Sequence, residues 1–421
     1  MQSLTLIGHV KDRANLVYRH GLTLLHLNLS VMMTGNKALE GSDELWQAFA
    51  SCPSLESLSI TKLHVSHKNW PVYWSLWSRL TCLRLLETSF SSKAPTSGGN
   101  GDSDTSQQLQ HRPLRPLSLF ALLEQEDPSQ PTKLKTLELH LLQGIERLKD
   151  HLAPLKFCPD LETFVWFVNP EPFTGKQLGR QLEEQVRYSP QLTNVTLGID
   201  YRNEDILVRF LESEASLPLL ELNLPRTQFE LNTWNLLREH HWSTLRTLDV
   251  SAFADGAAVQ DILCSLTGLE SFTGYAIRSQ DMVLDPRPWV CLGLKSIVIA
   301  IEILNGNVNG TQKVAMERLG TLTRLQQLQL RPIYGQFSLQ FRLTGFLESL
   351  ETWRDFRTLI FQYVPQELTE NDVRWMTEKW PRLHSVIGVL HLEATMDASL
   401  KKILIERGVQ IQHINTDVRI G

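Results

Sequence analysis

Cysteine is scarce in this sequence and is never closely paired. The five cysteines among 421 residues stand far apart, and none belongs to a C-x-x-C pair. This spacing argues against a zinc ribbon and against a thioredoxin-type redox motif, so we expect no metal and no other cofactor. The first residues also lack the long apolar run of a secretory signal. Isolated cysteines in such a chain are typical of reduced thiols, and we expect a protein of the cytoplasm, the nucleus or both.

Long apolar runs and an excess of basic residues are also missing. No stretch approaches the 18 or so uninterrupted apolar residues of a membrane span, so no membrane association is expected. The formal net charge is −5 and the isoelectric point is about 6.2, which does not favour nucleic acid as a partner. No phosphate-binding loop, dinucleotide-binding glycine motif, H-E-x-x-H or G-x-S-x-G occurs. We therefore expect a protein that is not an enzyme.

The sequence is rich, however, in one short pattern, apolar-x-x-apolar-x-apolar. From residue 134 onward its copies start 24 to 31 residues apart, close to the 20–29 residues of leucine-rich repeats. The copies are LTLLHL at 22, LESLSI at 55, LTCLRL at 80, LRPLSL at 114, LKTLEL at 134, LETFVW at 161, LTNVTL at 192, LLELNL at 219, LRTLDV at 245, LESFTG at 269, LKSIVI at 294, LQQLQL at 325, FRTLIF at 356 and LHSVIG at 383.

The pattern has a direct structural meaning. Its last apolar residues alternate with polar ones, which is the period of a strand buried on one face. The residues between copies often have a helical period, as in the segments 177–186 and 204–215. A single strand-and-helix unit cannot bury its apolar face, but a stack of such units can. The sequence predicts an α/β leucine-rich-repeat solenoid, or horseshoe, with parallel strands on the concave face and helices on the convex face.

One position before each strand is occupied by a restricted set of residues. Three residues before the first apolar residue of the pattern, Cys or Trp occurs in seven of eleven units. Because tryptophan cannot replace a thiolate ligand, this position is not a metal site, and we interpret it as a buried packing position, the joint. The joint residues are Cys52, Trp77, Cys158, Ser189, Ser216, Trp242, Leu266, Cys291, Leu322, Trp353 and Trp380.

The repeats extend over nearly the whole chain. We expect a single solenoid of about 14 irregular repeats over residues 1–421, which ends in a C-terminal capping unit at 395–421. Residues 91–112 are almost free of apolar side chains and are rich in Ser, Gly, Asp and Gln, which predicts a disordered polar insertion between two repeats. The segment 284–290, LDPRPWV, is predicted to be an ordered loop.

The predicted strands also indicate where a partner would bind. Side chains between the buried positions point into the concavity of a leucine-rich-repeat solenoid. A polar surface with isolated apolar anchors suits the recognition of a protein. The residues predicted to bind a partner on this concave face are Glu138, His140, Val165, Phe167, Asn194, Glu221, Asn223, Asp249, Val298, Gln329, Arg331 and Ile360.

The forms CPSLESLSI at 52 and CPDLETFVW at 158 resemble the repeats of fungal F-box proteins with a ribonuclease-inhibitor-like superhelix. The resemblance begins near residue 22, and the F-box itself, a helical segment before the repeats, is not recognised here. The resemblance implies a protein-interaction scaffold, the substrate-recognition part of an F-box-type ubiquitin ligase receptor. It also implies a monomer that would bind a cullin-RING ligase adaptor where an F-box is supplied.

The sequence leaves one alternative open, a stand-alone leucine-rich-repeat regulator of the RanGAP type. Such regulators act on GTPases and close their strands with Asn. The strands expected here rarely end in Asn, so the interaction scaffold is the preferred interpretation.

Overall fold

The computed structural model describes most of the chain, in two compact units: Met1–Leu217, here unit 1, and Pro218–Gly421, here unit 2. The described residues are 2–8, 11–31, 42–91, 132–141, 152–168, 175–199, 205–213, 217–226, 229, 231–252, 256–303, 308–332, 337–361 and 363–412.

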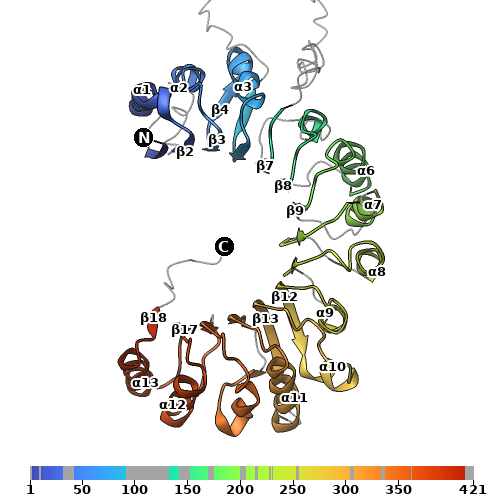
Figure 1. Ribbon diagram of the computed structural model, residues 1–421, viewed down its shortest axis with the longest axis vertical. Helices are drawn as coiled ribbons and strands as arrows, with labels where there is room; N and C mark the ends of the chain where they lie inside the picture. Colours follow the sequence, from blue (N-terminus) through green and yellow to red (C-terminus); the bar gives the residue numbers. More distant parts are fainter. Residues whose placement is uncertain are drawn as a thin grey trace, which may run out of the picture. The chain divides into compact units, whose positions relative to one another are not determined.

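Unit 1 consists of parallel strands on one side and helices on the other (Figure 1). Each strand pairs with the next one in register, so equivalent residues of successive repeats lie side by side. The strands in sheet order are β1 (Ser3–Gly8), β2 (His26–Val31), β3 (Ser57–Thr61), β5 (Cys82–Leu86), β7 (Thr136–His140), β8 (Thr163–Val168) and β9 (Asn194–Ile199). The other elements are α1 (Lys11–His20), η1 (Gly21–Thr23), α2 (Ser42–Ala50), η3 (His67–Asn69), α3 (Trp70–Trp77), η4 (Ala153–Phe157), α6 (Gly175–Val186), α7 (Asp205–Ser213) and the parallel pair β4 (His64–Ser66) and β6 (Ser89–Ser91).

Unit 2 repeats this arrangement. Its main strands are β10 (Glu221–Asn223), β11 (Thr247–Val250), β12 (Ser271–Arg278), β13 (Ser296–Ile303), β14 (Gln327–Leu330), β16 (Thr358–Phe361), β17 (Ser385–Gly388) and β18 (Gln410–Gln412), again all parallel. The other elements are α8 (Leu231–His240), α9 (Gly256–Leu263), α10 (Ser279–Leu284), α11 (Val308–Gly320), η6 (Leu343–Gly345), η7 (Leu347–Leu350), α12 (Glu370–Lys379), α13 (Ala394–Glu406) and the short strand β15 (Phe337–Ser338), which pairs antiparallel with β13.

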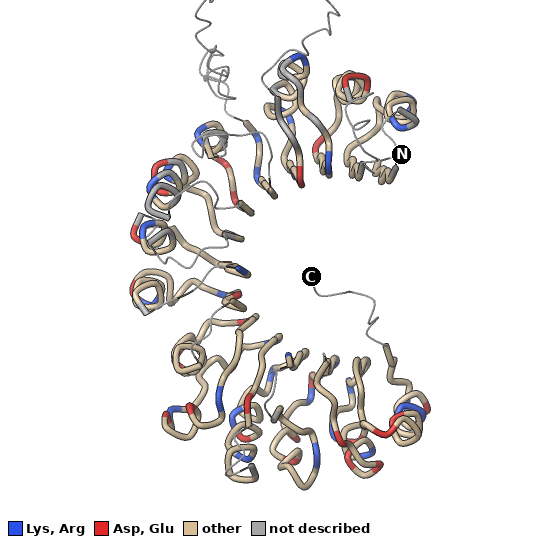
Figure 2. Tube along the Cα trace, turned by 180° about the vertical axis from the view of Figure 1, so that it is seen from behind, with Lys and Arg blue, Asp and Glu red and all other residues tan. Residues whose placement is uncertain are grey.

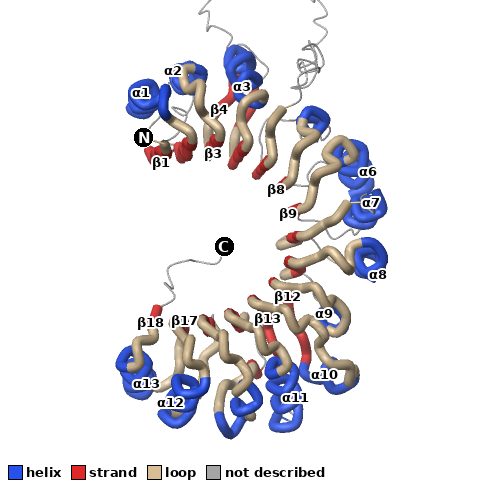
Figure 3. The backbone as a smooth tube through the Cα atoms, in the orientation of Figure 1, coloured by secondary structure: helices blue, strands red, loops and turns tan. Residues whose placement is uncertain are grey.

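Within each unit the strands line one side of an arc and the helices the other (Figure 3). The three apolar positions of the pattern form three buried rows between the two layers. In the repeat that contains β8, for example, Leu161, Phe164 and Trp166 are all fully buried. The predicted fold class, an α/β leucine-rich-repeat solenoid with a parallel sheet, is confirmed. No helix in the described part of the chain is long and apolar enough to cross a membrane.

The first repeat of the predicted series is wrong by two residues. Leu22, taken as the first apolar position, is 77% exposed, whereas Leu24 is fully buried. The correct copy is LLHLNL from residue 24, with Leu27 and Leu29 buried in β2. Residues 22, 24 and 25 are all leucine, so the apolar pattern alone could not show whether this copy starts at residue 22 or at residue 24. The copy at 114 lies outside the described residues.

The joint is a buried packing position, as predicted, with one correction. Cys52, Cys158, Cys291 and the three indoles of Trp77, Trp353 and Trp380 are all buried, while Ser216 lies outside the described residues. In the repeat of β11 the joint is His241, which is fully buried, whereas Trp242 is partly exposed. The His241 carbonyl accepts a hydrogen bond from the amide of Leu245, four residues later. At the joint of β8, by contrast, the Cys158 carbonyl accepts from the amide of Leu161, only three residues later. One extra residue therefore separates helix and strand in that repeat.

The other organisational predictions have mixed outcomes. The loop at 284–290 is described, with Trp289 buried in it. The predicted insertion, residues 91–112, lies outside the described residues apart from Ser91, the last residue of β6. In the C-terminal segment 395–421, α13 and β18 form a last helix and strand, and residues 413–421 lie outside the described part. A single solenoid with a capping unit stays a prediction.

Candidate functional site

The strand face of each unit presents two rows of side chains that alternate with the buried rows. All twelve residues predicted to bind a partner are partly exposed. In unit 2 the register of the strands defines the rows. The first strand-face row is Glu221, Thr247, Ser271, Ser296, Gln327, Thr358, Ser385 and Gln410. The second strand-face row is Asn223, Asp249, Thr273, Val298, Gln329, Ile360, Ile387 and Gln412.

In unit 1 the structure brings four strand-face residues together as one cluster. Arg84 Nε lies 2.9 Å from Glu138 Oε1 across β5 and β7. Glu138 Oε2 lies 3.9 Å from His140 Nε2, an ion pair when the imidazole is protonated. The His140 ring stacks on Phe167 of β8, with centroids 4.4 Å apart. Phe167 in turn covers Gly198 of β9, where any Cβ would overlap its ring. The glycine thus makes room for the aromatic ring of Phe167.

The remaining predicted residues occupy separate places. Val165 lies between Glu138 and Thr196 in the register of unit 1, and Asn194 donates from Nδ2 to Thr163 Oγ1 at 3.4 Å. In unit 2 the two acidic residues of the strand-face rows, Glu221 and Asp249, each accept a hydrogen bond from a residue two positions away in the sequence. Asn223 donates to Glu221 Oε1 at 2.7 Å, and Asp249 accepts from the Ser251 amide at 2.9 Å.

Val298, Gln329 and Ile360 lie on neighbouring strands of the second strand-face row. Arg331 follows β14, and its amide donates to the Ile299 carbonyl at 3.0 Å. The structure therefore places all twelve residues on the two strand faces, and in unit 1 it joins Glu138, His140 and Phe167 into a bonded cluster.

The sequence reasoning missed a third row, which we call the rim. It consists of the residue that directly follows the first apolar position of each copy. Its backbone hydrogen bonds run from repeat to repeat, each amide donating to the preceding rim carbonyl at 2.7–3.0 Å. The rim of unit 1 is Leu25, Glu56, Thr81, Lys135, Glu162 and Thr193. The rim of unit 2 is Leu220, Arg246, Glu270, Lys295, Gln326, Arg357 and His384.

Two rim ion pairs link neighbouring repeats. Lys135 Nζ lies 2.6 Å from Glu162 in unit 1, and this hydrogen bond raises the pKa of the lysine. Lys295 Nζ lies 2.5 Å from Glu270 in unit 2, and the hydrogen bond from the lysine lowers the pKa of that carboxyl. Both pairs are exposed, so water screens them and each contributes little to stability. A sequence signal did exist, because the rim residue sits at a fixed place in every copy.

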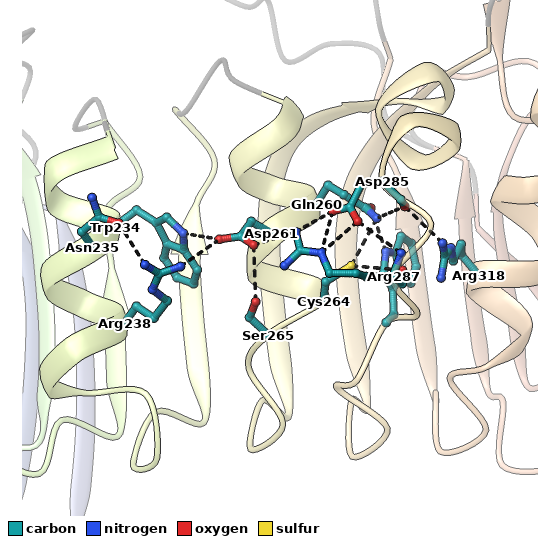
Figure 4. Close-up of polar contacts among 11 residues, drawn as sticks. Trp234, Asn235, Arg238, Gln260, Asp261, Cys264, Ser265, Asp285, Arg287 and Arg318 are labelled. Carbon is teal, nitrogen blue, oxygen red and sulfur yellow. Dashed lines mark hydrogen bonds and ion pairs between the residues drawn. The ribbon is translucent and has the colours of Figure 1, made fainter.

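A polar network on the helix side of unit 2 is the second candidate site (Figure 4). Asp261 of α9 accepts from Trp234 Nε1 of α8 at 2.6 Å and pairs with Arg287 at 2.8 Å. Arg287 also pairs with Asp285 at 2.6 Å. The hydrogen bonds from Arg287 lower the pKa of Asp285, and those to Asp285 and Asp261 raise the pKa of Arg287.

One buried and one partly buried contact extend this network. Gln260 of α9 accepts from Trp289 Nε1 at 2.9 Å, and Arg318 of α11 donates to the Asp285 carbonyl at 3.2 Å. The network thus ties α8, α9, α11 and the loop at 285–290 together.

The thiol in this network is not an activated nucleophile. Burial, followed by the nearby Asp285 charge, raises the pKa of Cys264 to about 11, so the reactive thiolate is disfavoured. Among the described residues no group of three or more His, Cys, Asp or Glu side chains could hold a metal ion. A shallow hollow at the end of α8, lined by Arg238, Glu239, His240, Trp242 and Ser243, lacks such a group as well. The network joins the helices of unit 2, and the strand faces carry the residues predicted to bind a partner.

Comparison with known proteins finds solved structures of low similarity. No protein-family profile matches the sequence, and no curated protein matches it. Among solved structures, an internalin of Listeria monocytogenes is 11% identical over 88% of this chain and 83% of its own, with a TM-score of 0.42. Yeast Rad7, in a complex of Rad7 and Elc1, is 16% identical over 68% and 83%, with a TM-score of 0.41. TLR13, in a complex with ssRNA13, is 14% identical over 93% and 60%, with a TM-score of 0.37.

Proposed function

We propose that this chain is a non-enzymatic scaffold that binds a protein target on its strand faces. One observation supports the proposal most directly: successive hydrogen-bonded strands present the side chains of the strand-face rows in register, and all of these in β13, β14, β16 and β17 but the buried Ser385 are at least partly exposed. Such a surface is preformed, so a partner does not bear the cost of ordering it. Isolated apolar side chains such as Ile360 and Phe167, set among polar ones, match the few anchors that supply most of the energy in protein interfaces.

More specifically, we propose the substrate-recognition part of an F-box-type ubiquitin ligase receptor. The support is the resemblance of CPSLESLSI and CPDLETFVW to the repeats of that family. In this role the strand faces hold the target, while a cullin-RING adaptor is recruited where an F-box is supplied. The protein would act as a monomer in the cytoplasm, the nucleus or both.

Site-specific photo-cross-linking tests the scaffold function. A photoreactive amino acid replaces Gln329 on the strand face of unit 2, and in a matched control it replaces Arg374, which is exposed on α12. The full chain is then irradiated in cells, and its adducts are identified by mass spectrometry. We expect a discrete protein adduct from position 329 and none from position 374. Adducts confined to position 374 contradict the proposal.

The ligase role has its own test. The protein cross-linked at position 329 should gain ubiquitin when the full chain is overexpressed, and the cullin-RING adaptor should co-purify with the chain. An unchanged level of ubiquitylation excludes the receptor role but leaves the scaffold function intact. Stimulated GTP hydrolysis by a co-purifying GTPase would instead support the RanGAP-type alternative.

A further inference from the structure

The strand face of unit 2 contains a long strip without charge. Twelve positions of the two strand-face rows lie on β12, β13, β14, β16, β17 and β18, and none is Asp, Glu, Lys or Arg. Val298, Ile360 and Ile387 are its aliphatic members. A partner can cover these three side chains without burying a charge of this chain, which would cost free energy unless it was paired.

A basic rim borders this strip. Arg246, Lys295 and Arg357 occupy alternate positions of the rim, with Glu270 and Gln326 between them. Lys295 and Arg357 precede β13 and β16 of the strip, whereas Arg246 precedes β11, the strand beside it. Neighbouring strands lie about 4.8 Å apart, so the three cations follow one another at roughly 10 Å. Lys295 is paired with Glu270. Arg246 and Arg357 are exposed, and neither forms an ion pair within the described residues.

One further arginine strengthens the positive charge along this edge. Arg324 lies two residues before the rim residue Gln326 and is exposed. Arg382, in the equivalent position near β17, is paired with Asp355 at 2.5 Å. Arg246, Arg324 and Arg357 thus form no ion pair among the described residues, although Arg246 donates to the Gly268 carbonyl at 3.1 Å. Among the described residues this edge carries more basic than acidic side chains.

We propose that unit 2 binds an acidic, extended segment of a protein partner. Its carboxylates face the rim, and its apolar side chains contact Val298, Ile360 and Ile387. This inference rests on the proposed function and adds the chemistry of the partner. Complementary charge at a rim mainly speeds association and selects among partners, and its effect weakens with salt.

A nucleic acid fits the same surface less well. Single strands bind by stacking bases on aromatic side chains along a groove with many cations. None of the twelve strip positions is aromatic, and the free cations of the edge are few. The rim of unit 1 does not favour an acidic segment. Its Lys135 is paired with Glu162, and its Glu56 pairs with no cation of the described residues.

Fluorescence anisotropy with the full chain tests this inference. The probe is a labelled peptide that alternates Glu with Val; a Gln–Val peptide, a Lys–Val peptide and a single-stranded oligonucleotide serve as comparisons. We expect the Glu–Val peptide to bind most tightly, with an affinity that falls as salt rises. Arg357→Gln should weaken it up to roughly fivefold, the range of an exposed ion pair, and Arg357→Glu should weaken it more. The control Arg407→Gln removes the same charge from an exposed residue after α13 and should have no effect.

The possible outcomes separate this inference from the proposed function. If Gln329 cross-links a protein but the Glu–Val and Gln–Val peptides bind equally, the acidic partner is overturned and the scaffold stands. Tighter binding of the oligonucleotide, dependent on Arg357, also overturns it. A thermal melt of each variant excludes a loss of folding as the cause. An Arg357-dependent preference for the acidic peptide supports the inference even where cross-linking finds no target.

Discussion

Unit 1 and unit 2 are built from the same repeat but differ in what surrounds the buried rows. In unit 1 the strand face carries charges and rings bonded to one another, from Arg84 to Phe167. In unit 2 the strip from β12 to β18 is uncharged and is bordered by unpaired arginines such as Arg357. The repeat therefore constrains only the buried positions, and the residue types on the strand face and the rim can differ between the units.

The joints differ as well. Both units use cysteine and tryptophan at this position, but in unit 1 Trp77 stands between Cys52 and Cys158, whereas in unit 2 Trp353 and Trp380 fill it in consecutive repeats. The two indoles stack with centroids 5.6 Å apart. Each donates its Nε1 hydrogen to a carbonyl of the preceding repeat, Trp353 to Leu319 and Trp380 to Leu350. These two tryptophans thus fill the buried joint and also donate hydrogen bonds to the preceding repeat, whereas a thiol is only a weak donor.

The largest effect we predict separates these joints. Trp353→Ala removes a fully buried indole and should reduce the free energy of unfolding by about 3–5 kcal/mol. Cys158→Ala at the equivalent position in unit 1 should cost only about 1 kcal/mol, because little apolar volume is lost. Denaturant titration, with hydrogen exchange to assign the change to a unit, measures both. Equal losses from the two variants would mean that the joints are equivalent.

A smaller effect tests the bonded cluster of unit 1. In Gly198→Ala the new Cβ overlaps the Phe167 ring, so the ring must leave its place and its stacking on His140. We expect a loss of about 1–2 kcal/mol from the forced movement and the lost aromatic contact. Thermal melts give the loss, and NMR of the His140 ring reports the displaced Phe167. Unchanged His140 resonances would show that the ring stays in place. The control Gly293→Ala, in unit 2, meets only one carbonyl at an ordinary distance of 3.7 Å and should be nearly neutral.

The sequence was sufficient for the fold because the buried rows are set by a local period. Leu161, Phe164 and Trp166 could be assigned from spacing alone, and so could the partly exposed residues between them. The frame at Leu24 and the joint at His241 were missed, since doubled leucines and one inserted residue leave the apolar pattern nearly unchanged. The bonded cluster and the rim depend on side chains from different repeats, and a spacing pattern does not show how these pair.

A weaker prediction concerns acid stability. The three carboxyl groups whose pKa is clearly lowered, Glu270, Asp285 and Glu351, all belong to the described part of unit 2. For Asp285 the cause is first the hydrogen bonds from Arg287. A lowered pKa gives stability that is present above the ordinary value of 3.8 and is lost as the pH falls through the native value.

Asp285→Asn should therefore lower stability at pH 7 by roughly 0.5 kcal/mol, since water screens the half-exposed arginine. It should also flatten the decline between pH 5 and pH 3, and melting temperatures across this range measure both effects. Glu162→Gln in unit 1, which removes the exposed carboxylate of the ion pair with Lys135, is the matched control. An acid-induced decline of the same size in Asp285→Asn and in the unaltered chain would exclude Asp285 as its source.

The smallest effect uses a thiol to report on one strand face. Cys82 is partly exposed in unit 1, between Ser57 and Thr136 in the register, while the other four cysteines are buried. Burial raises the pKa of Cys158 and Cys291 to about 12. A thiol reagent at pH 8 should thus label one cysteine in the native chain, all five after unfolding, and none in native Cys82→Ser. Because the acidic peptide is expected on unit 2, it should leave the labelling rate of Cys82 unchanged. Slower labelling in its presence would place that peptide on unit 1 and remove the functional distinction between the two strand faces.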